Sequence, residues 1–129
     1  MGYVPNALLS RLRGRNLNSV VFLQSYLQLT FDGPYLNCDV WPKVDVGAGE
    51  IEFGHPGYRD AICSFLDCPV LVTREETGVG LVLEFEMGTI RIHPMREQLN
   101  GPEIALLAGF DDRAWMCWRP GEDSFEDLA

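Results

Sequence analysis

The chain has 129 residues, of which 47% are hydrophobic, and 19 acidic residues against 10 basic ones give a formal net charge of −9 at pH 7. This length and composition predict one domain over residues 1–129, with a core that needs neither a metal nor disulfide bonds. An acidic surface repels nucleic acid and favours a basic protein partner, although acidity also serves solubility alone. Because the chain has no apolar run of about 18 residues and does not begin with the pattern of a secretory signal, we expect a cytoplasmic protein without a membrane partner.

The first third of the chain predicts a short helix followed by strands. Residues 5–14 allow a helix with Asn6 as its N-cap and Gly14 as its end. Residues 19–23 are rich in Val and Phe, which favour a strand. Residues 26–31 then alternate between apolar and polar side chains, as expected for a strand with one buried face.

Two segments of the chain, approximately residues 17–42 and 68–94, share one pattern. In each, an alternating apolar strand is followed by a turn with glycine and a second alternating run, which predicts a hairpin. We interpret the match as repeated architecture, while two ordinary hairpins with a chance similarity stay an alternative. The matched apolar residues are Leu27, Leu29, Phe31, Leu36 and Cys38 in the first copy and Leu81, Leu83, Phe85, Ile90 and Ile92 in the second.

A connection, a helix and a C-terminal extension complete the predicted elements. Residues 41–57 are rich in glycine and predict a link with one short strand at 51–53. From residue 58 to 66, apolar residues recur at helical spacing. The extension, residues 102–129, predicts a hairpin around Asp111 and Asp112, although a short helix would also suit its first run. The whole pattern predicts an α+β fold with a largely antiparallel sheet, built from two similar three-stranded units, a connecting helix and a C-terminal hairpin.

The cysteines and histidines do not predict a catalytic or metal site. The spacing of Cys63 and Cys68 is wider than in a zinc knuckle, no second pair accompanies it, and neither His55 nor His93 lies at ligand spacing from a cysteine pair. No phosphate-binding glycine motif is present. We therefore expect reduced structural cysteines, no cofactor, no metal and no catalytic residue.

The C-terminal extension interleaves aromatic, arginine and acidic residues, which is typical of protein interfaces. Strand alternation would direct Trp115 and Trp118 to opposite faces, so at least one of them is expected on a less buried surface. Two tryptophans that cap the core are the alternative. Residues 75–78 predict a turn, and carboxylates at predicted turns are expected to be solvated. The predicted partner-binding residues are Glu75, Glu76, Asp111, Asp112, Trp115, Trp118, Glu122, Asp123, Glu126 and Asp127.

The doubled Leu-x-Leu-x-Phe pattern, the helix at 58–66 and the Trp-containing end resemble small uncharacterised bacterial proteins, some of which resemble immunity proteins encoded beside polymorphic toxins. The resemblance implies a stoichiometric inhibitor that binds a cognate toxin and occludes its active site without catalysis. Together with the acidic composition, it favours a basic toxin domain as the partner. It assigns no role to any single residue. Two alternatives stay open: a small-ligand-binding or enzymatic domain with a cavity between the repeat units, holding His93, Cys38 or an inward carboxylate, and a structural module that self-assembles through its sheet edges.

Overall fold

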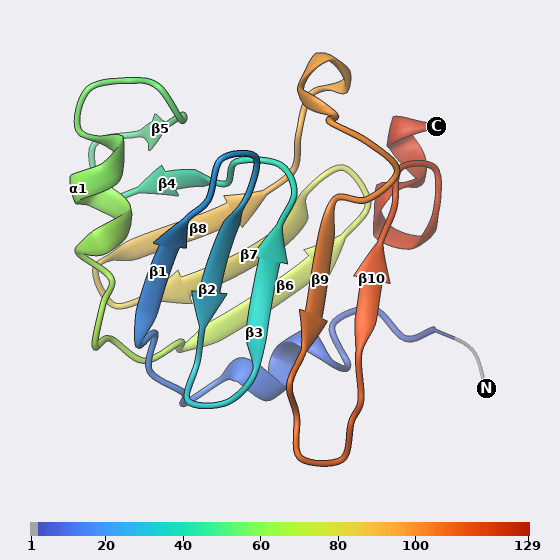
Figure 1. The fold of residues 1–129 in the computed structure, drawn as a ribbon, viewed down its shortest axis with the longest axis horizontal. Coiled ribbons are helices and arrows are strands. Elements are labelled where there is room, and N and C mark those ends of the chain that lie inside the picture. Colours follow the sequence, from blue (N-terminus) through green and yellow to red (C-terminus); the bar gives the residue numbers. More distant parts are fainter. Residues whose placement is uncertain (1–2) are drawn as a thin grey trace.

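Two antiparallel sheets of five strands each face one another in the computed structural model, which describes residues 3–129 (Figure 1). The α+β class and the antiparallel pairing are confirmed, and the strands divide into two sheets. The first sheet has the order β1 (Ser19–Phe22), β2 (Leu27–Thr30), β3 (Tyr35–Cys38), β9 (Ala105–Ala108) and β10 (Met116–Trp118). The second has the order β5 (Glu50–Ile51), β4 (Lys43–Asp45), β8 (Gly88–Ile92), β7 (Gly80–Phe85) and β6 (Val72–Glu76).

The helices are short and lie at the margins of the sheets (Figure 1). They are the α-helix α1 (Tyr58–Cys63) and the 3₁₀ helices η1 (Leu9–Leu12), η2 (Arg96–Gln98) and η3 (Asp123–Leu128). None of the helices within residues 3–129 has the length and apolar character needed to cross a membrane.

The two halves of the chain exchange hairpins between the sheets. Strands β1, β2 and β3 lie side by side in the first sheet, after which the chain crosses over and adds the hairpin β4–β5 beside β8. Strands β6, β7 and β8 lie in the second sheet, after which the hairpin β9–β10 returns to the first sheet beside β3. Each sheet therefore depends on both halves of the chain.

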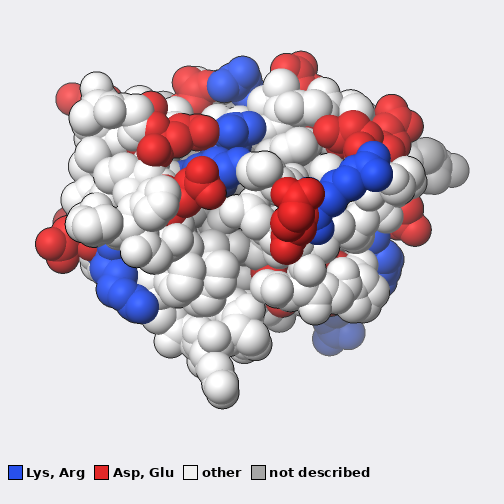
Figure 2. Space-filling model, turned by 90° about the horizontal axis from the view of Figure 1, so that it is seen from above, with Lys and Arg blue, Asp and Glu red and all other residues white. Residues whose placement is uncertain are grey.

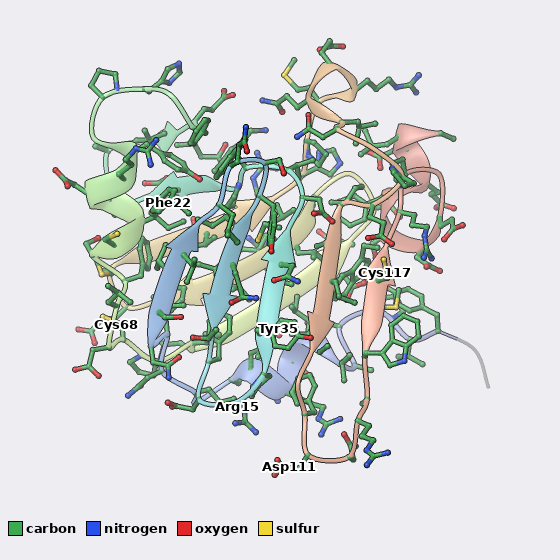
Figure 3. All side chains as sticks on the ribbon, viewed as in Figure 1. Arg15, Phe22, Tyr35, Cys68, Asp111 and Cys117 are labelled. Carbon is green, nitrogen blue, oxygen red and sulfur yellow. The ribbon has the colours of Figure 1, made fainter. Side chains whose placement is uncertain are left out.

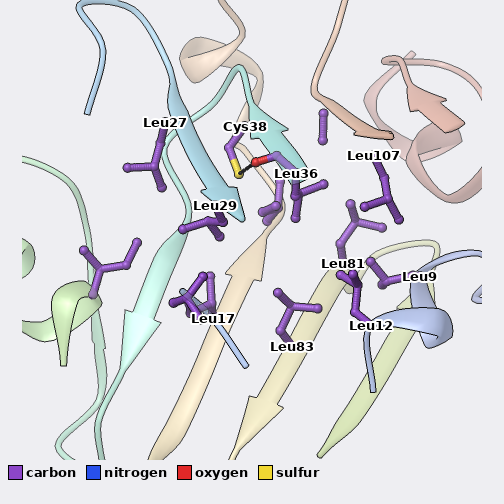
Figure 4. Packing of buried hydrophobic residues seen from close by; sticks show 14 of the residues in the cluster. Leu9, Leu12, Leu17, Leu27, Leu29, Leu36, Cys38, Leu81, Leu83 and Leu107 are labelled. Carbon is purple, nitrogen blue, oxygen red and sulfur yellow. Dashed lines mark hydrogen bonds between the residues drawn. The ribbon is translucent and has the colours of Figure 1, made fainter. Parts of the chain in front are cut away.

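The core lies between the sheets and follows the predicted alternation. Leu27 and Leu29 of β2 and Leu81 and Leu83 of β7 are at most 1% exposed. Figure 4 shows these side chains meeting between the two layers, with Leu36 of β3 beside them. Burial of a leucine contributes about 1.5–3 kcal/mol, so the alternating residues are the principal source of stability.

Several elements differ from their sequence predictions. The helix predicted for residues 5–14 is reduced to η1, and Asn6 caps nothing there, because its side chain exchanges hydrogen bonds with Thr73 of β6. Helix α1 ends at Cys63, and Leu66, expected on its buried face, is 39% exposed. In the predicted link, β4 was not foreseen, and β5 starts one residue before the strand expected at 51–53 and ends two residues before the end of that strand. Hydrogen bonds from other parts of the chain override local preference in such short elements.

The N-terminal segment covers the free edge of the second sheet next to β6. Gly14 donates its backbone N–H to the Val70 carbonyl oxygen at 2.8 Å, and Val70 donates to the Arg15 carbonyl oxygen at 3.0 Å. Further along, the Asn6 amide donates to the Thr73 carbonyl oxygen at 3.2 Å. An uncovered edge strand would be open to pairing with another chain, so this segment protects the sheet and also brings residues 3–8 close to β10.

Candidate partner-binding site

Glu75 lies in strand β6 and points inward. We expected a solvated turn at residues 75–78, but β6 continues to Glu76, and alternation along the strand then places Thr73 and Glu75 on its buried face. Glu75 is only 7% exposed. The expectation that its carboxylate is solvated is therefore wrong, and the reason is the length of the strand.

Three donors from distant parts of the chain satisfy the Glu75 carboxylate. Oε1 accepts the backbone N–H of Asn6 at 2.7 Å. Oε2 accepts the Trp118 indole Nε1–H at 2.7 Å and the Ser124 hydroxyl at 3.1 Å. Because the hydrogen of Ser124 is used in this bond, the Tyr3 hydroxyl donates to Ser124 Oγ at 3.0 Å. The carboxylate thus joins the N-terminal segment, β6, β10 and η3.

None of these donors carries a positive charge. In the part of the chain that the structure describes, the ion pairs involve other carboxylates, and no Lys, Arg or His side chain is paired with Glu75. Buried charges are normally paired with an opposite charge, because removing them from water is costly. Glu75 is therefore a buried carboxylate that has hydrogen bonds without a counter-ion.

A hollow of about 200 Å³ opens beside this carboxylate, between the N-terminal segment and β10. Glu75 is the charged residue among those that line it, and the others are apolar or aromatic. The N-terminal segment contributes Tyr3, Val4, Ala7 and Leu8, and the other wall consists of Trp115, Met116 and Trp118.

The two C-terminal tryptophans have opposite environments. Trp118 is 1% exposed and bonded to Glu75, whereas Trp115 is 65% exposed. Trp115 lies just before β10, so the sheet does not hold its side chain against the core. The prediction that at least one tryptophan lies on a less buried surface is confirmed by Trp115, and Trp118 belongs to the core.

Trp115 is the centre of an exposed apolar surface. Val4 is 62% exposed and Tyr3 is 37% exposed. Leu8 and Met116 are half-buried beside them in the same hollow. We call the set Tyr3, Val4, Leu8, Trp115 and Met116 the Trp115 surface.

The loop between β9 and β10 contains the predicted residues Asp111 and Asp112, both exposed. Figure 3 shows Asp111 at the far end of this loop, with Cys117 on β10. Asp112 pairs with Arg11 of η1 at 3.1 Å. Hydrogen bonds from the Arg11 guanidinium, and then from the Ala114 backbone N–H, lower the pKa of Asp112. The pair ties the loop to the N-terminal segment, so Asp112 has a structural partner already.

The remaining predicted carboxylates lie around η3 and the end of β6. Asp127 is paired with His93, its Oδ2 lying 2.9 Å from Nε2. Glu126 accepts a hydrogen bond from the Thr77 hydroxyl at 3.4 Å, which joins η3 to the end of β6. Among residues 3–129, four exposed carboxylates of this region form no ion pair, and we call them the acidic margin: Glu76, Glu122, Asp123 and Glu126.

Charge elsewhere on the molecule is mixed. Viewed from above, acidic side chains alternate with basic ones and do not form one continuous patch (Figure 2). On this face, therefore, the excess of acidic residues does not form a single acidic surface.

An aromatic cluster that sequence reasoning missed lies near α1. The rings of Trp41 and Phe53 are stacked with centroids 3.9 Å apart, and the Arg59 guanidinium lies 4.8 Å from the centroid of Phe22. A hollow of about 430 Å³ adjoins it and includes His55 in its lining. These side chains come from β1, α1 and the link at 41–57, and no local pattern indicates that they meet.

Of the groups expected in an enzymatic alternative, Glu75 is the inward carboxylate that lines a hollow, whereas Cys38 and His93 lie elsewhere. Cys38 is fully buried, and burial, with Asp39 nearby, raises the pKa of its thiol far above the usual range. His93 stacks on Phe125 and pairs with Asp127 at the margin of η3. Within residues 3–129, no group of three or more His, Cys, Asp or Glu side chains is arranged to hold a metal ion.

No protein-family model, curated protein or solved structure matches this chain.

Proposed function

We propose that the protein is a non-catalytic binding protein of the immunity or antitoxin type, which recognises a basic toxin domain through the Trp115 surface. The observation that carries this proposal is the 65% exposure of Trp115 next to the exposed Val4. Tryptophan is among the residues that contribute most at protein interfaces, because it buries a large area with few rotatable bonds. A tryptophan left in water at the centre of an apolar surface is best explained by a partner that covers it.

The charge of the partner follows from the acidic margin. Tyr3 of the Trp115 surface is hydrogen bonded to Ser124 of η3, so the apolar surface adjoins the segment that carries Glu122, Asp123 and Glu126. Exposed carboxylates without local counter-ions accelerate encounter with a basic protein and orient it at the interface. The proposed mechanism is occlusion: the bound protein covers the basic, functional surface of its partner and needs no chemistry of its own.

The repeated architecture is a second part of the proposal. The pairs Leu29 with Leu36 and Leu83 with Ile90 are directly opposite each other in their sheets, and they have the same spacing in the chain. We infer that the three-stranded units β1–β3 and β6–β8, each followed by an exchanged hairpin, are related. In this plan the repeated units build the core. The binding surface lies where the N-terminal segment meets the C-terminal extension, and neither of these segments is repeated.

The small-ligand alternative receives less support at this position. Pockets for drug-sized ligands have volumes of about 300–1,000 Å³, and the hollow next to Trp115 has about 200 Å³. The hollow is instead large enough to hold one side chain of a protein partner. The self-assembly alternative is weakened at β6, whose edge the N-terminal segment covers.

The test is direct binding to the product of the adjacent gene, with purified proteins and isothermal titration calorimetry. Trp115→Ala should weaken binding by about 30-fold or more, the effect of losing an interface residue worth about 2 kcal/mol. Met95→Ala is the matched control, because Met95 is 55% exposed on a different segment, and this variant should bind as the original protein does.

A toxin-like neighbour should also lose its activity when one equivalent of the protein is added. The proposal fails if the neighbour neither binds nor is neutralised, or if Trp115→Ala and Met95→Ala have equal effects.

A further inference from the structure

Glu75 combines two properties that rarely occur together in a stable core. Its side chain is almost entirely buried, yet it lines a hollow that is open to solvent beside an exposed tryptophan. It also has no counter-ion within the described part of the chain. Buried carboxylates are usually paired, because water no longer stabilises their charge.

We propose that this hollow binds the ammonium or guanidinium group of a Lys or Arg side chain that the partner inserts beside Trp115. The inference rests on the proposed function, and it identifies the chemistry by which the Trp115 surface selects a basic partner. The inserted group would supply the positive charge that Glu75 does not have in the free protein.

The hydrogen bonds of Glu75 are all of the kind that a carboxylate accepts. Asn6 N–H and Trp118 Nε1–H can only donate, so both Glu75 oxygens act as acceptors. Both bonds measure 2.7 Å, at the short end of the range of about 2.7–2.9 Å that is typical when an ion takes part. Ser124 donates as well, so no neighbour requires a proton from Glu75.

One acceptor position of the carboxylate is still available. A carboxylate offers about four lone-pair sites, and three are used. Oε2 accepts two bonds, whereas Oε1 accepts only the Asn6 N–H. The proposal therefore assigns the bond from the cationic donor to Oε1, where it displaces no existing donor.

The walls of the hollow suit the rest of such a side chain. Aromatic rings from Tyr3, Trp115 and Trp118 line it, and their faces attract cations. The aliphatic side chains Val4 and Leu8 can contact the methylene groups of lysine or arginine. A lysine or arginine therefore meets its three requirements here: apolar contacts for its stem, aromatic faces near its charge and a carboxylate at its end.

The neighbouring cations are occupied elsewhere. Arg11 is paired with Asp112 and lies over the Phe110 ring. Arg74 lies on the exposed face of β6, opposite the face that contains Glu75, and is paired there with Glu84. Among residues 3–129, no lysine or arginine lines the hollow, so the proposed cation comes from the partner.

The experiment uses n-butylammonium chloride as a probe of the lysine side chain, with the full chain labelled with ¹⁵N. Three tryptophans give three indole N–H signals. The Trp118 and Trp115 signals should shift in a saturable manner with a millimolar dissociation constant, and the signal of Trp41, which lies outside the hollow, should stay in place. 1-Butanol, which has the same stem without the charge, should bind about fivefold or more weakly.

Two variants test the role of the carboxylate. Glu75→Gln keeps the size and removes the charge, and it should weaken butylammonium binding about tenfold or more while butanol binding stays the same. The amide hydrogens of Glu75→Gln would face the Asn6 N–H, which can prevent that variant from folding. In that case Trp115→Ala replaces it, and this variant should weaken butylammonium binding about threefold or more. Its exposed position leaves the fold unaffected.

The outcomes separate this inference from the proposed function. It is overturned if butylammonium causes no saturable shift, or if it binds no better than butanol, even when Trp115→Ala still abolishes partner binding. A second outcome is that butylammonium binds but the variant, Glu75→Gln or its replacement Trp115→Ala, does not weaken partner binding. In that case the hollow binds a free amine, and the assignment to a side chain of the partner is wrong. A failure of partner binding alone, with the butylammonium site intact, overturns the proposed function and with it that assignment.

Discussion

Trp118 Nε1 donates a 2.7 Å hydrogen bond to Glu75 Oε2, and both residues are buried. This bond connects β10, at the edge of the first sheet, with β6, at the edge of the second. The same carboxylate holds Asn6 and Ser124, so the ends of the described chain are attached at one point. The Trp115 surface is built on this connection, and its geometry depends on it.

Trp118→Phe should destabilise the protein, because it removes the indole donor while it keeps an aromatic ring in the core. The loss of one partner of a buried hydrogen bond costs about 1–3 kcal/mol in free energy of unfolding. Urea unfolding monitored by circular dichroism measures this change. Trp41→Phe is the control, since that ring stacks on Phe53 away from Glu75. Equal losses in the two variants would show that ring size, not the bond to Glu75, decides the result.

Gly88→Ala should be strongly destabilising. Gly88 begins β8, and a Cβ placed there would collide with the carbonyl oxygen of Asp45 in the neighbouring strand β4. Overpacking of this kind costs about 1–3 kcal/mol or more in free energy of unfolding. Gly101→Ala is the control, because a Cβ at that position meets open space and should change stability by less than about 0.5 kcal/mol. Thermal unfolding of both variants checks the prediction, and a Gly88→Ala protein as stable as the original would contradict this strand spacing.

The pair of Glu50 and Arg91 should give stability that depends on pH. Arg91 donates from Nε to Glu50 Oε2 at 2.7 Å and from Nη2 to Oε1 at 2.9 Å. The hydrogen bonds from Arg91 lower the pKa of Glu50. A carboxyl group with a lowered folded-state pKa stabilises the fold above its unfolded pKa of about 4.3, and this contribution is lost as the pH falls through the folded value.

We therefore expect Glu50→Gln to reduce the free energy of unfolding at pH 7 by less than about 1 kcal/mol, because the pair is partly exposed. The difference from the original protein should shrink as the pH falls below the unfolded pKa and vanish below the folded one. Urea titrations from pH 7 to acid pH measure it. Glu97→Gln, at an exposed position of η2, is the control. A difference that persists when Glu50 is protonated would rule out the ion pair as its cause.

The cysteines should react with iodoacetamide in a definite order. The thiolate is the reactive form, and burial raises the pKa of Cys38 and, together with Glu103, that of Cys117. Cys63 and Cys68 are only half-buried. In the folded protein at about pH 8, mass spectrometry should find Cys63 and Cys68 modified first and Cys38 only after unfolding. Early modification of Cys38 would mean that the sheets separate readily.

Structural features that depend on local residue patterns were predicted from the sequence, and features that depend on contacts between distant segments were not. Alternating residues such as Leu29 and Leu83 identified strands and their buried faces, since the period of a strand is a local property. The C-terminal hairpin was also predicted, although Trp115 lies outside its strand. Strand β4 was missed, because its three residues lie within a glycine-rich connection and are held by pairing with β8.

The candidate site was predicted in part. Trp115 was among the expected partner-binding residues and is exposed, as one tryptophan was predicted to be. Glu75 and Trp118 were expected to contact a partner, but in the free protein they contact each other. Tyr3 and Val4 were missed, because nothing in the N-terminal sequence indicates that it lies beside β10.

The sequence by itself determined the strands, the apolar faces that meet in the core and the excess of acidic residues, since each depends on residue type and short spacing. Only the tertiary structure decided that the strands divide into two sheets that exchange hairpins. It also decided that a carboxylate predicted to be solvated is buried against an indole far away in the chain. Contacts of that kind arise when separate segments are brought together by the burial of the shared core, and no local pattern records which segments will meet.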